Sequence, residues 1–194
     1  MSMNDQDMDL KARLVQVGVD LVTEEGTQPL TLREIARRAG VSHGAPRRHF
    51  PTHLDLLSAI ARRGFEDLAA RAAEATEGRT DPRERLTALA RVYLDFARTR
   101  RGMFELMFRH DLLESGRLGL RDTSLPLFAT LTELVAALRP DDQDPRILAG
   151  ALWAGLHGVA QLWGWGSLRL ATGTDDVEPL LRATLDAHLG PAAR

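Results

Sequence analysis

Side chains that donate hydrogen bonds gather in one short stretch of the chain, between residues 42 and 53. The arginines and histidines of this stretch are Arg47, Arg48, His43, His49 and His53. Arginine can pair with phosphate or bond a guanine edge through two hydrogen bonds, and glycine, here Gly44, lets a backbone approach DNA closely. The stretch therefore predicts a surface that binds a large anion, of which nucleic acid is the commonest.

The distribution of charge supports this interpretation, although the total does not. The whole chain carries a formal net charge of -2. Residues 31–63 carry seven arginines against Glu34 and Asp55, a net charge of +5, between flanks of -4 and -3. A basic segment between acidic flanks favours an anion-binding face. On charge alone, a solvated surface without a partner fits equally well.

Two short predicted helices position these donors. Thr31 and Glu34 have the spacing of a capping box that opens the first helix, and Gly40 ends it with a positive φ. Ser42 is expected to cap the second helix. The residues expected on the inner side are Leu32, Ile35, Ala36 and Val41. Two short helices joined by a tight turn with glycine predict a helix-turn-helix.

The stretch from Thr31 to Leu57 resembles the DNA-binding region of the tetracycline-repressor family. The matching residues are Thr31, Ile35, Ala36, Ala39, Gly40, Val41, Ser42, Gly44, His49 and Phe50. Two positions depart from the family: Arg47 replaces a tyrosine that contacts phosphate, and His53 replaces a lysine that does the same. Both can bind phosphate, His53 fully only when protonated.

The resemblance implies a homodimer that binds double-stranded DNA at a palindromic operator. A small, mostly apolar ligand is then expected to release the protein from its operator. The resemblance implies that the protein is a repressor or, less often in the family, an activator. The expected DNA contacts are Thr31, Arg33, Ser42, His43, Gly44, Ala45, Arg47, Arg48, His49 and His53.

Helical periodicity dominates the remainder, and the chain is predicted to be all-α with about nine helices. The expected helices cover about residues 8–25, 31–39, 42–50, 52–77, 81–101, 103–115, 123–138, 144–166 and 176–189. We expect a DNA-binding domain at 1–53, with a frayed acidic start, and a ligand-binding and dimerisation domain at 54–194.

Residues 147–168 form a run of 22 without a formal charge, which is long enough to span a bilayer. Five glycines, His157 and Gln161 argue against a membrane helix, and favour a helix buried by its own fold and by a partner. Gly150, Ala154 and Gly158 are spaced by four and would let a second helix approach closely. The resemblance places this helix and the last one in the dimer interface.

An apolar ligand site is predicted from two groups of residues. Met103, Phe104, Met107 and Phe108 bunch at helical spacing, and Trp153 and His157 lie on a later helix. The pair Trp153 and His157, followed by Gly158, also resembles a subgroup of the family. Methionines would accept ligands of varied shape and His157 would orient them. The alternative is that these residues only fill the hydrophobic core.

Other functions find little support in the sequence. No cofactor motif and no nucleophile motif occurs, so we predict that the chain is not an enzyme. His49 and His53 have the spacing of a metal pair, but Pro51 should interrupt the helix between them. The chain has no cysteine, and we expect a cytoplasmic location. A helical protein-interaction module without DNA binding remains the alternative.

Overall fold

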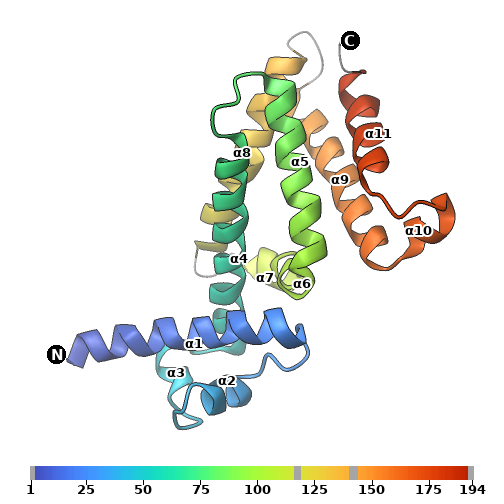
Figure 1. Cartoon of the computed structure of the whole chain (residues 1–194). Helices are drawn as coiled ribbons and strands as arrows, with labels where there is room; N and C mark the ends of the chain where they lie inside the picture. The colour runs from blue at the N-terminus through green and yellow to red at the C-terminus, as the bar shows by residue number, and fades with distance from the viewer. Residues whose placement is uncertain (1–2, 116–118, 140–143, 192–194) are drawn as a thin grey trace. The chain divides into compact units, whose positions relative to one another are not determined.

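The computed structural model describes residues 3–115, 119–139 and 144–191 (Figure 1). All regular secondary structure in these ranges is helical, which confirms the all-α prediction. The helices are α1 (Met3–Glu25), α2 (Leu32–Arg38), α3 (Pro46–His49), α4 (His53–Thr76), α5 (Pro82–Thr99), α6 (Arg101–Met107), α7 (His110–Ser115), α8 (Leu120–Leu138), α9 (Pro145–Gly164), α10 (Ser167–Thr172) and α11 (Glu178–Leu189).

The described residues thus form eleven helices where about nine were predicted. The predicted helix 103–115 divides into α6 and α7 around Phe108 and Arg109. The uncharged run 147–168 ends as α9 at Gly164, and α10 begins after Gly166, which has φ of 80°. Helix α1 begins at Met3, five residues before the predicted start, so the acidic beginning is helical from there.

The chain divides into two compact units. Unit 1 comprises Met1–Asp67 and Arg100–Thr123, and unit 2 comprises Leu68–Thr99 and Ser124–Arg194. Helix α4 begins in unit 1 and ends in unit 2. The functional boundary after residue 53 stays a prediction.

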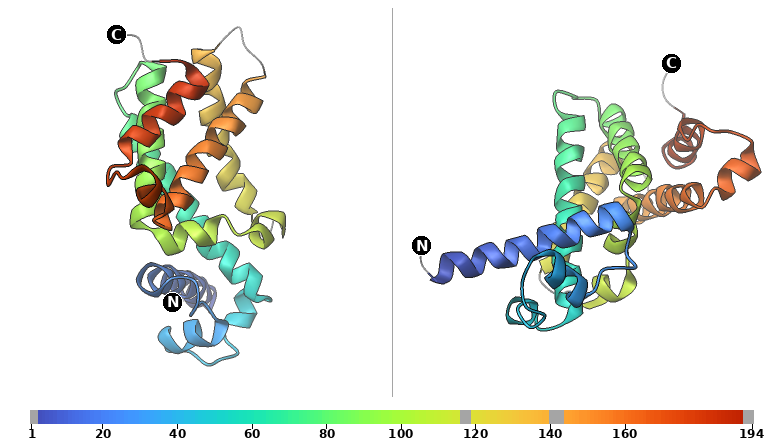
Figure 2. Two further views of the ribbon diagram at one scale, coloured as in Figure 1. Left: turned by 90° about the vertical axis from the view of Figure 1, so that its right-hand side faces the viewer. Right: turned by 60° about the horizontal axis from the view of Figure 1, so that its bottom comes forward.

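In unit 1, α1 packs against α2, α3 and α6 (Figures 1 and 2). Two glycines make the packing possible. A Cβ on Gly18 would collide with the side chain of Ile60, and a Cβ on Gly102 would collide with the carbonyl oxygen of Val22. The core beneath includes Leu14, Leu21, Ile35, Phe50 and Ile60, all fully buried.

In unit 2, α9 packs against α5 and α11, which also contact each other (Figure 2). Gly155 of α9 faces α11, where a Cβ would lie 3.0 Å from the methyl group of Thr184. Ion pairs join α5 to α11: Arg83 with Asp186 and Arg91 with Glu178. Within the described residues, no helix has both the length and the apolar content needed to cross a membrane.

Candidate functional site

The first helix of the helix-turn-helix, α2, begins as the sequence predicts. Thr31 is its N-cap, and the hydroxyl oxygen of Thr31 accepts a hydrogen bond from the backbone N–H of Glu34 at 3.2 Å. The reciprocal half of the capping box does not form as predicted. The carboxylate of Glu34 instead accepts hydrogen bonds from Arg37 and Arg38, because these side chains lie one turn further along the same helix.

Arg37 and Arg38 are therefore exposed but bound to carboxylates of the same chain. Arg37 approaches Glu34 with nitrogen-to-oxygen distances of 2.6 and 2.9 Å, and Arg38 also pairs with Glu25 at the end of α1. Hydrogen bonds from Arg37 and then Arg38 lower the pKa of Glu34 to about 2, so its carboxylate stays charged at neutral pH. This network joins α1 to α2.

The second helix, α3, is shorter than predicted and has a different start. Ser42 does not cap it: α3 covers Pro46–His49, Ala45 is its N-cap, and no side chain bonds the cap. Proline suits the first helical position because its φ is already helical, so Pro46 decides where α3 begins. Residues 43–45 form the turn that precedes α3. Gly40 has φ of 66°, as predicted for the turn after α2.

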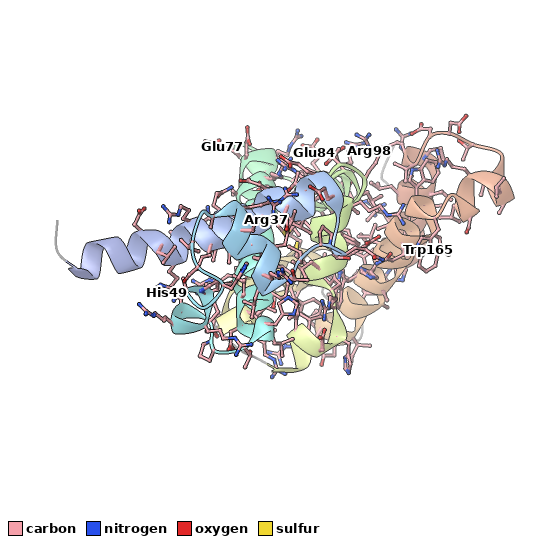
Figure 3. All side chains as sticks on the ribbon, turned by 90° about the horizontal axis from the view of Figure 1, so that it is seen from below. Arg37, His49, Glu77, Glu84, Arg98 and Trp165 are labelled. Atoms are coloured by element: carbon pink, nitrogen blue, oxygen red, sulfur yellow. The ribbon has the colours of Figure 1, made fainter. Side chains whose placement is uncertain are left out.

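Most of the predicted DNA contacts lie at the surface of unit 1, where Figure 3 shows the ends of α2 and α3 with Arg37 and His49 labelled. Ala45 and His49 are half-buried. The exposed ones are Thr31, Arg33, Ser42, His43, Gly44, Arg47, Arg48 and His53. In the described part of the chain, the guanidinium groups of Arg33, Arg47 and Arg48 make no ion pair or hydrogen bond. Arg62 and Arg63, the other two arginines of the basic segment, pair with Glu66.

Helix α3 is held by a buried residue at each of its two ends. Pro46 and Phe50 are buried, so the side chains between them, Arg47 and Arg48, point outward. The ammonium group of Lys11 in α1 lies 5.9 Å from the centre of the Phe50 ring. The short helix is thus anchored on both sides of its two arginines.

The predicted capping box at the start of α4 forms completely. The backbone N–H of Thr52 donates to the Asp55 carboxylate at 2.9 Å, and the Asp55 N–H donates to the Thr52 hydroxyl at 3.1 Å. His53 is exposed, but its Nε2 bonds the carbonyl oxygen of Leu30. Only its other ring nitrogen, Nδ1, is left for a phosphate. His49 and His53 belong to separate helices, α3 and α4.

The four residues predicted for a ligand site around 103–108 lie in unit 1 and fill its core. Met103, Phe104 and Met107 are buried. The two methionines pack on Gly64, where a Cβ would lie 2.6 Å from the sulfur of Met107 and 2.7 Å from that of Met103. Phe108 stacks edge-on against Phe65, with ring centres 5.7 Å apart. Their burial fits the alternative of core filling, and a ligand-binding role for this group stays a prediction.

Trp153 and His157 lie in unit 2, in a polar network with Tyr93; Tyr93 and His157 are half-buried, and Trp153 is exposed. The indole N–H of Trp153 donates to the Tyr93 hydroxyl at 3.1 Å, and that hydroxyl lies 2.7 Å from Nδ1 of His157. Nε2 of His157 lies 3.3 Å from the Gln161 amide. Burial raises the pKa of Tyr93 and lowers that of His157, so both are neutral at pH 7.

Tyr93 was not predicted as a site residue. The sequence carried one signal for it: Tyr93 is the sole tyrosine and occupies an otherwise apolar stripe of its helix. A buried tyrosine hydroxyl needs a partner, which here comes from α9.

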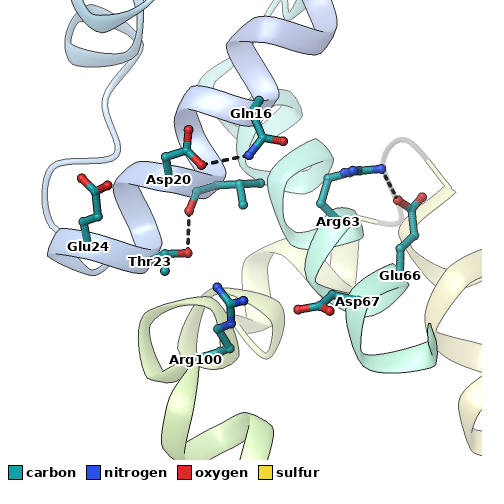
Figure 4. A pocket seen from close by; sticks show the side chains of 9 residues that line it. Gln16, Asp20, Thr23, Glu24, Arg63, Glu66, Asp67 and Arg100 are labelled. Atoms are coloured by element: carbon teal, nitrogen blue, oxygen red, sulfur yellow. Dashed lines mark hydrogen bonds and ion pairs between the residues drawn. The ribbon is translucent and has the colours of Figure 1, made fainter. Parts of the chain in front are cut away.

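A hollow of about 540 Å³ lies in unit 1 between α1, α4 and Arg100 (Figure 4). Its walls are polar and charged, and they include Asp20, Glu24, Arg63 and Asp67. None of the predicted ligand-binding residues lines it. An open hollow with charged walls does not suit a mostly apolar ligand.

The residues predicted for dimerisation share one open side of α9. A Cβ added to Gly150 or Gly158 would meet no atom within 4 Å, and Ala154 is exposed. Ile147, Leu162 and Trp165 lie on the same side and are also exposed. Within the described residues this apolar side of α9 is uncovered.

Comparison with known proteins identifies the family. The model of the tetracyclin repressor-like C-terminal domain matches residues 86–188, which is more than half of the chain. The model of bacterial regulatory proteins of the tetR family matches residues 14–60. The chain belongs to the tetracycline-repressor family, as the sequence predicted.

One curated relative is the HTH-type transcriptional activator FasR of Mycolicibacterium smegmatis, 29% identical over 101 residues that cover 52% of this chain and 46% of FasR. The chain spans about half the length of the curated relatives it matches. A protein of unknown function from Rhodococcus sp. RHA1 shares the fold with a TM-score of 0.78, 28% identity and 93% coverage of both chains. RolR in complex with resorcinol has a TM-score of 0.69 at 21% identity, over 98% of this chain and 92% of RolR.

Proposed function

We propose that the protein is a sequence-specific DNA-binding transcriptional regulator that acts as a homodimer. The observation that carries the proposal is the contrast among the arginines of the basic segment. Four of them are bound to carboxylates, whereas Arg33, Arg47 and Arg48 are exposed on α2 and α3 and make no ion pair. Unpaired guanidinium groups on a helix-turn-helix suit phosphate and guanine.

Arg47 and Arg48 are proposed to read or clamp the major groove, since the buried residues on either side turn both outward. The proposed contacts to the DNA backbone are Thr31, Arg33, Ser42, His43, His49 and His53, with Gly44 and Ala45 in the turn that approaches the groove. Two such heads in a dimer must reach successive major grooves roughly 34 to 36 Å apart, or further on a longer operator. The operator should therefore be an imperfect palindrome.

The test is the double variant Arg47→Ala, Arg48→Ala in a gel-shift titration with operator DNA. Each arginine that reads a base contributes about 1 to 3 kcal/mol. We expect at least a roughly tenfold weaker affinity, since about 1.4 kcal/mol is tenfold. The matched control is Arg62→Ala, Arg63→Ala, which removes two adjacent arginines of the same unit that are paired with Glu66. Equal affinities of the two double variants would count against the assignment.

Dimerisation is proposed through α9 and α11. The supporting observation is the uncovered apolar side of α9, because a soluble monomer rarely exposes such a continuous patch. Light scattering at micromolar concentration measures the assembly. A monomeric wild-type chain would refute this part of the proposal.

A small ligand is proposed to bind in unit 2 beside Trp153, His157 and Tyr93 and to release the DNA, as in a repressor. Three aromatic side chains with polar tips can orient a mostly apolar molecule. RolR, which has the same fold, binds resorcinol. A coupling of about 1 to 3 kcal/mol would weaken DNA binding roughly 5 to 150-fold, and DNA would weaken ligand binding by the same factor. Native mass spectrometry of the purified protein identifies what it carries.

A further inference from the structure

The hollow in unit 1 is lined by side chains of both charges. Its volume of about 540 Å³ lies within the range of small-molecule sites, roughly 300 to 1,000 Å³. It shares no residue with the proposed DNA contacts or with the ligand site of unit 2. In Figure 4 the side chains of α1 and those of α4 stand on opposite sides, and Arg100 reaches in between them. The charged residues of the lining are Asp20, Glu24, Arg63, Glu66, Asp67 and Arg100.

Arg100 enters the hollow because the first turn of α6 is pressed against the end of α1. A Cβ on Gly102 would collide with the carbonyl oxygen of Val22, so the two helices touch through their backbones. The carbonyl oxygen of Arg100 accepts a hydrogen bond from the N–H of Phe104 at 2.8 Å, which fixes the backbone of Arg100 at the beginning of α6. Its side chain is half-buried and points into the hollow (Figure 4).

The guanidinium group of Arg100 makes no ion pair or hydrogen bond with any residue that the structure describes. By contrast, Arg63 of the same hollow is exposed and pairs with Glu66 at 3.0 Å. Taking a charged group partly out of water costs free energy unless new hydrogen bonds replace those to water. A planar guanidinium can bond a carboxylate through two parallel N–H groups. Arg100 therefore favours a ligand that carries a carboxylate.

The α1 side of the hollow offers oxygen atoms to a cation. Asp20 and Glu24 are both exposed and four residues apart, which is about 6 Å along the helix. Oδ1 of Asp20 accepts a hydrogen bond from the amide of Gln16 at 2.8 Å, and its Oδ2 bonds none of the described residues. Glu24 lies 3.9 Å from Arg38, too far for a hydrogen bond. Both carboxylates can therefore accept hydrogen bonds from a ligand.

The balance of charge in the hollow indicates the class of ligand. Four carboxylates against two guanidinium groups give the lining a net negative charge, which attracts a net cation more strongly than a neutral molecule or an anion. Arg100 nevertheless favours one carboxylate. An amino acid with a basic side chain carries one carboxylate and two cationic groups at neutral pH. It meets both conditions.

We propose that the hollow of unit 1 binds a basic amino acid such as lysine, with its carboxylate on Arg100 and its cationic groups on Asp20 and Glu24. The bound amino acid joins α1 to the beginning of α6, and α1 packs against α2 and α3. The hollow is thus a second ligand site, which lies in the unit of the helix-turn-helix and is independent of the ligand site proposed in unit 2.

Isothermal titration calorimetry of the full chain with three probes tests the proposal. L-lysine carries all three charged groups, cadaverine lacks the carboxylate, and L-norleucine lacks the side-chain ammonium. Losing a hydrogen bond between charged groups weakens binding roughly tenfold or more. We therefore expect L-lysine to bind most tightly and each of the other two probes to bind roughly tenfold or more weakly.

Two variants assign the ligand groups to their partners. Arg100→Gln should weaken L-lysine binding roughly tenfold and leave cadaverine binding unchanged, because cadaverine has no carboxylate. Asp20→Asn should weaken the binding of both. The matched control is Asp9→Asn, which changes an exposed acidic residue of α1 outside the hollow and should affect neither probe. Thermal unfolding without a probe shows whether each variant is folded.

Three outcomes would overturn the proposal. If L-lysine shows no saturable binding to the wild-type chain, the hollow is not a site for this class of ligand. Equal affinities of the wild-type chain for L-lysine and cadaverine would refute the contact between a carboxylate and Arg100. Binding of L-lysine that neither Arg100→Gln nor Asp20→Asn weakens would show that the amino acid binds outside the hollow.

Discussion

The folded state disfavours the protonated, charged form of His157. Burial beside Tyr93 and Trp153 lowers its pKa below the ordinary value of 6.5. The unfolded chain therefore takes up a proton at a higher pH than the folded chain does. The contribution of neutral His157 to the free energy of unfolding is complete above pH 6.5. This contribution is lost as the pH falls from 6.5 through the lowered pKa of His157 in the folded state.

We expect the free energy of unfolding to decrease between about pH 7.5 and about pH 5.5, and His157→Gln to reduce that decrease. The measurement is urea unfolding at both pH values. His43→Gln is the matched control, because His43 is an exposed histidine. If the two variants show the same dependence on pH as the wild type, burial of His157 does not oppose its charge.

The capping box at the start of α4 was predictable, because its two residues are near neighbours in the sequence. Thr52 and Asp55 are three positions apart, and their capping box forms as predicted. The pairing of Arg38 with Glu25 spans thirteen residues and depends on how α1 crosses α2. The role of Tyr93 depends on α9, which lies sixty residues further along. The spacing of residues along one helix does not predict these two contacts.

At the scale of elements, the link between α3 and α4 determines where the two arginines of α3 stand. Phe50 is buried at the end of α3, and the Thr52 and Asp55 capping box begins α4 three residues later. Satisfied N–H groups at the start of α4 prevent its first turn from fraying. The start of α4 is therefore fixed relative to α3.

Asp55→Ala should lower the free energy of unfolding by about 1 to 2 kcal/mol, because it removes the acceptor of the Thr52 N–H and hydroxyl. For a chain of this length each kcal/mol lowers Tm by roughly 2 to 4 °C. Thermal unfolding measures the change. Glu74→Ala, an exposed acidic residue late in the same helix, is the control and should leave Tm nearly unchanged. A similar Tm for both variants would show that the box contributes little.

Helix boundaries were predicted where capping residues mark them and missed where packing decides. Thr31 and Thr52 correctly marked the beginnings of α2 and α4. Ser42 did not mark α3, because the proline four residues later sets its start. The break at Phe108 was also missed: Phe108 packs on Phe65 of α4, and this contact is tertiary.

At the scale of the whole molecule, ion pairs leave fewer arginines of the basic segment available to a polyanion than the sequence suggests. The basic segment contains seven arginines, but Glu34, Glu25 and Glu66 hold four of them. The pair of Arg38 with Glu25 joins α2 to α1, whereas the other pairs lie within α2 or within α4. What remains for a polyanion is concentrated on Arg33, Arg47 and Arg48.

This pairing limits how many counterions the protein can release from DNA. Each phosphate neutralised on B-DNA contributes about -0.9 to the slope of log K against log salt concentration. Three arginines from each protomer give a slope of about -5 for a dimer, whereas seven would give about -13. Operator affinity measured over a series of salt concentrations at neutral pH gives this number directly. A slope near the larger value would mean that DNA draws Arg37, Arg38, Arg62 and Arg63 away from their carboxylates. The smaller slope means that a fourfold rise in salt weakens operator binding by roughly a thousandfold, instead of the roughly ten-million-fold or more that seven arginines from each protomer would give.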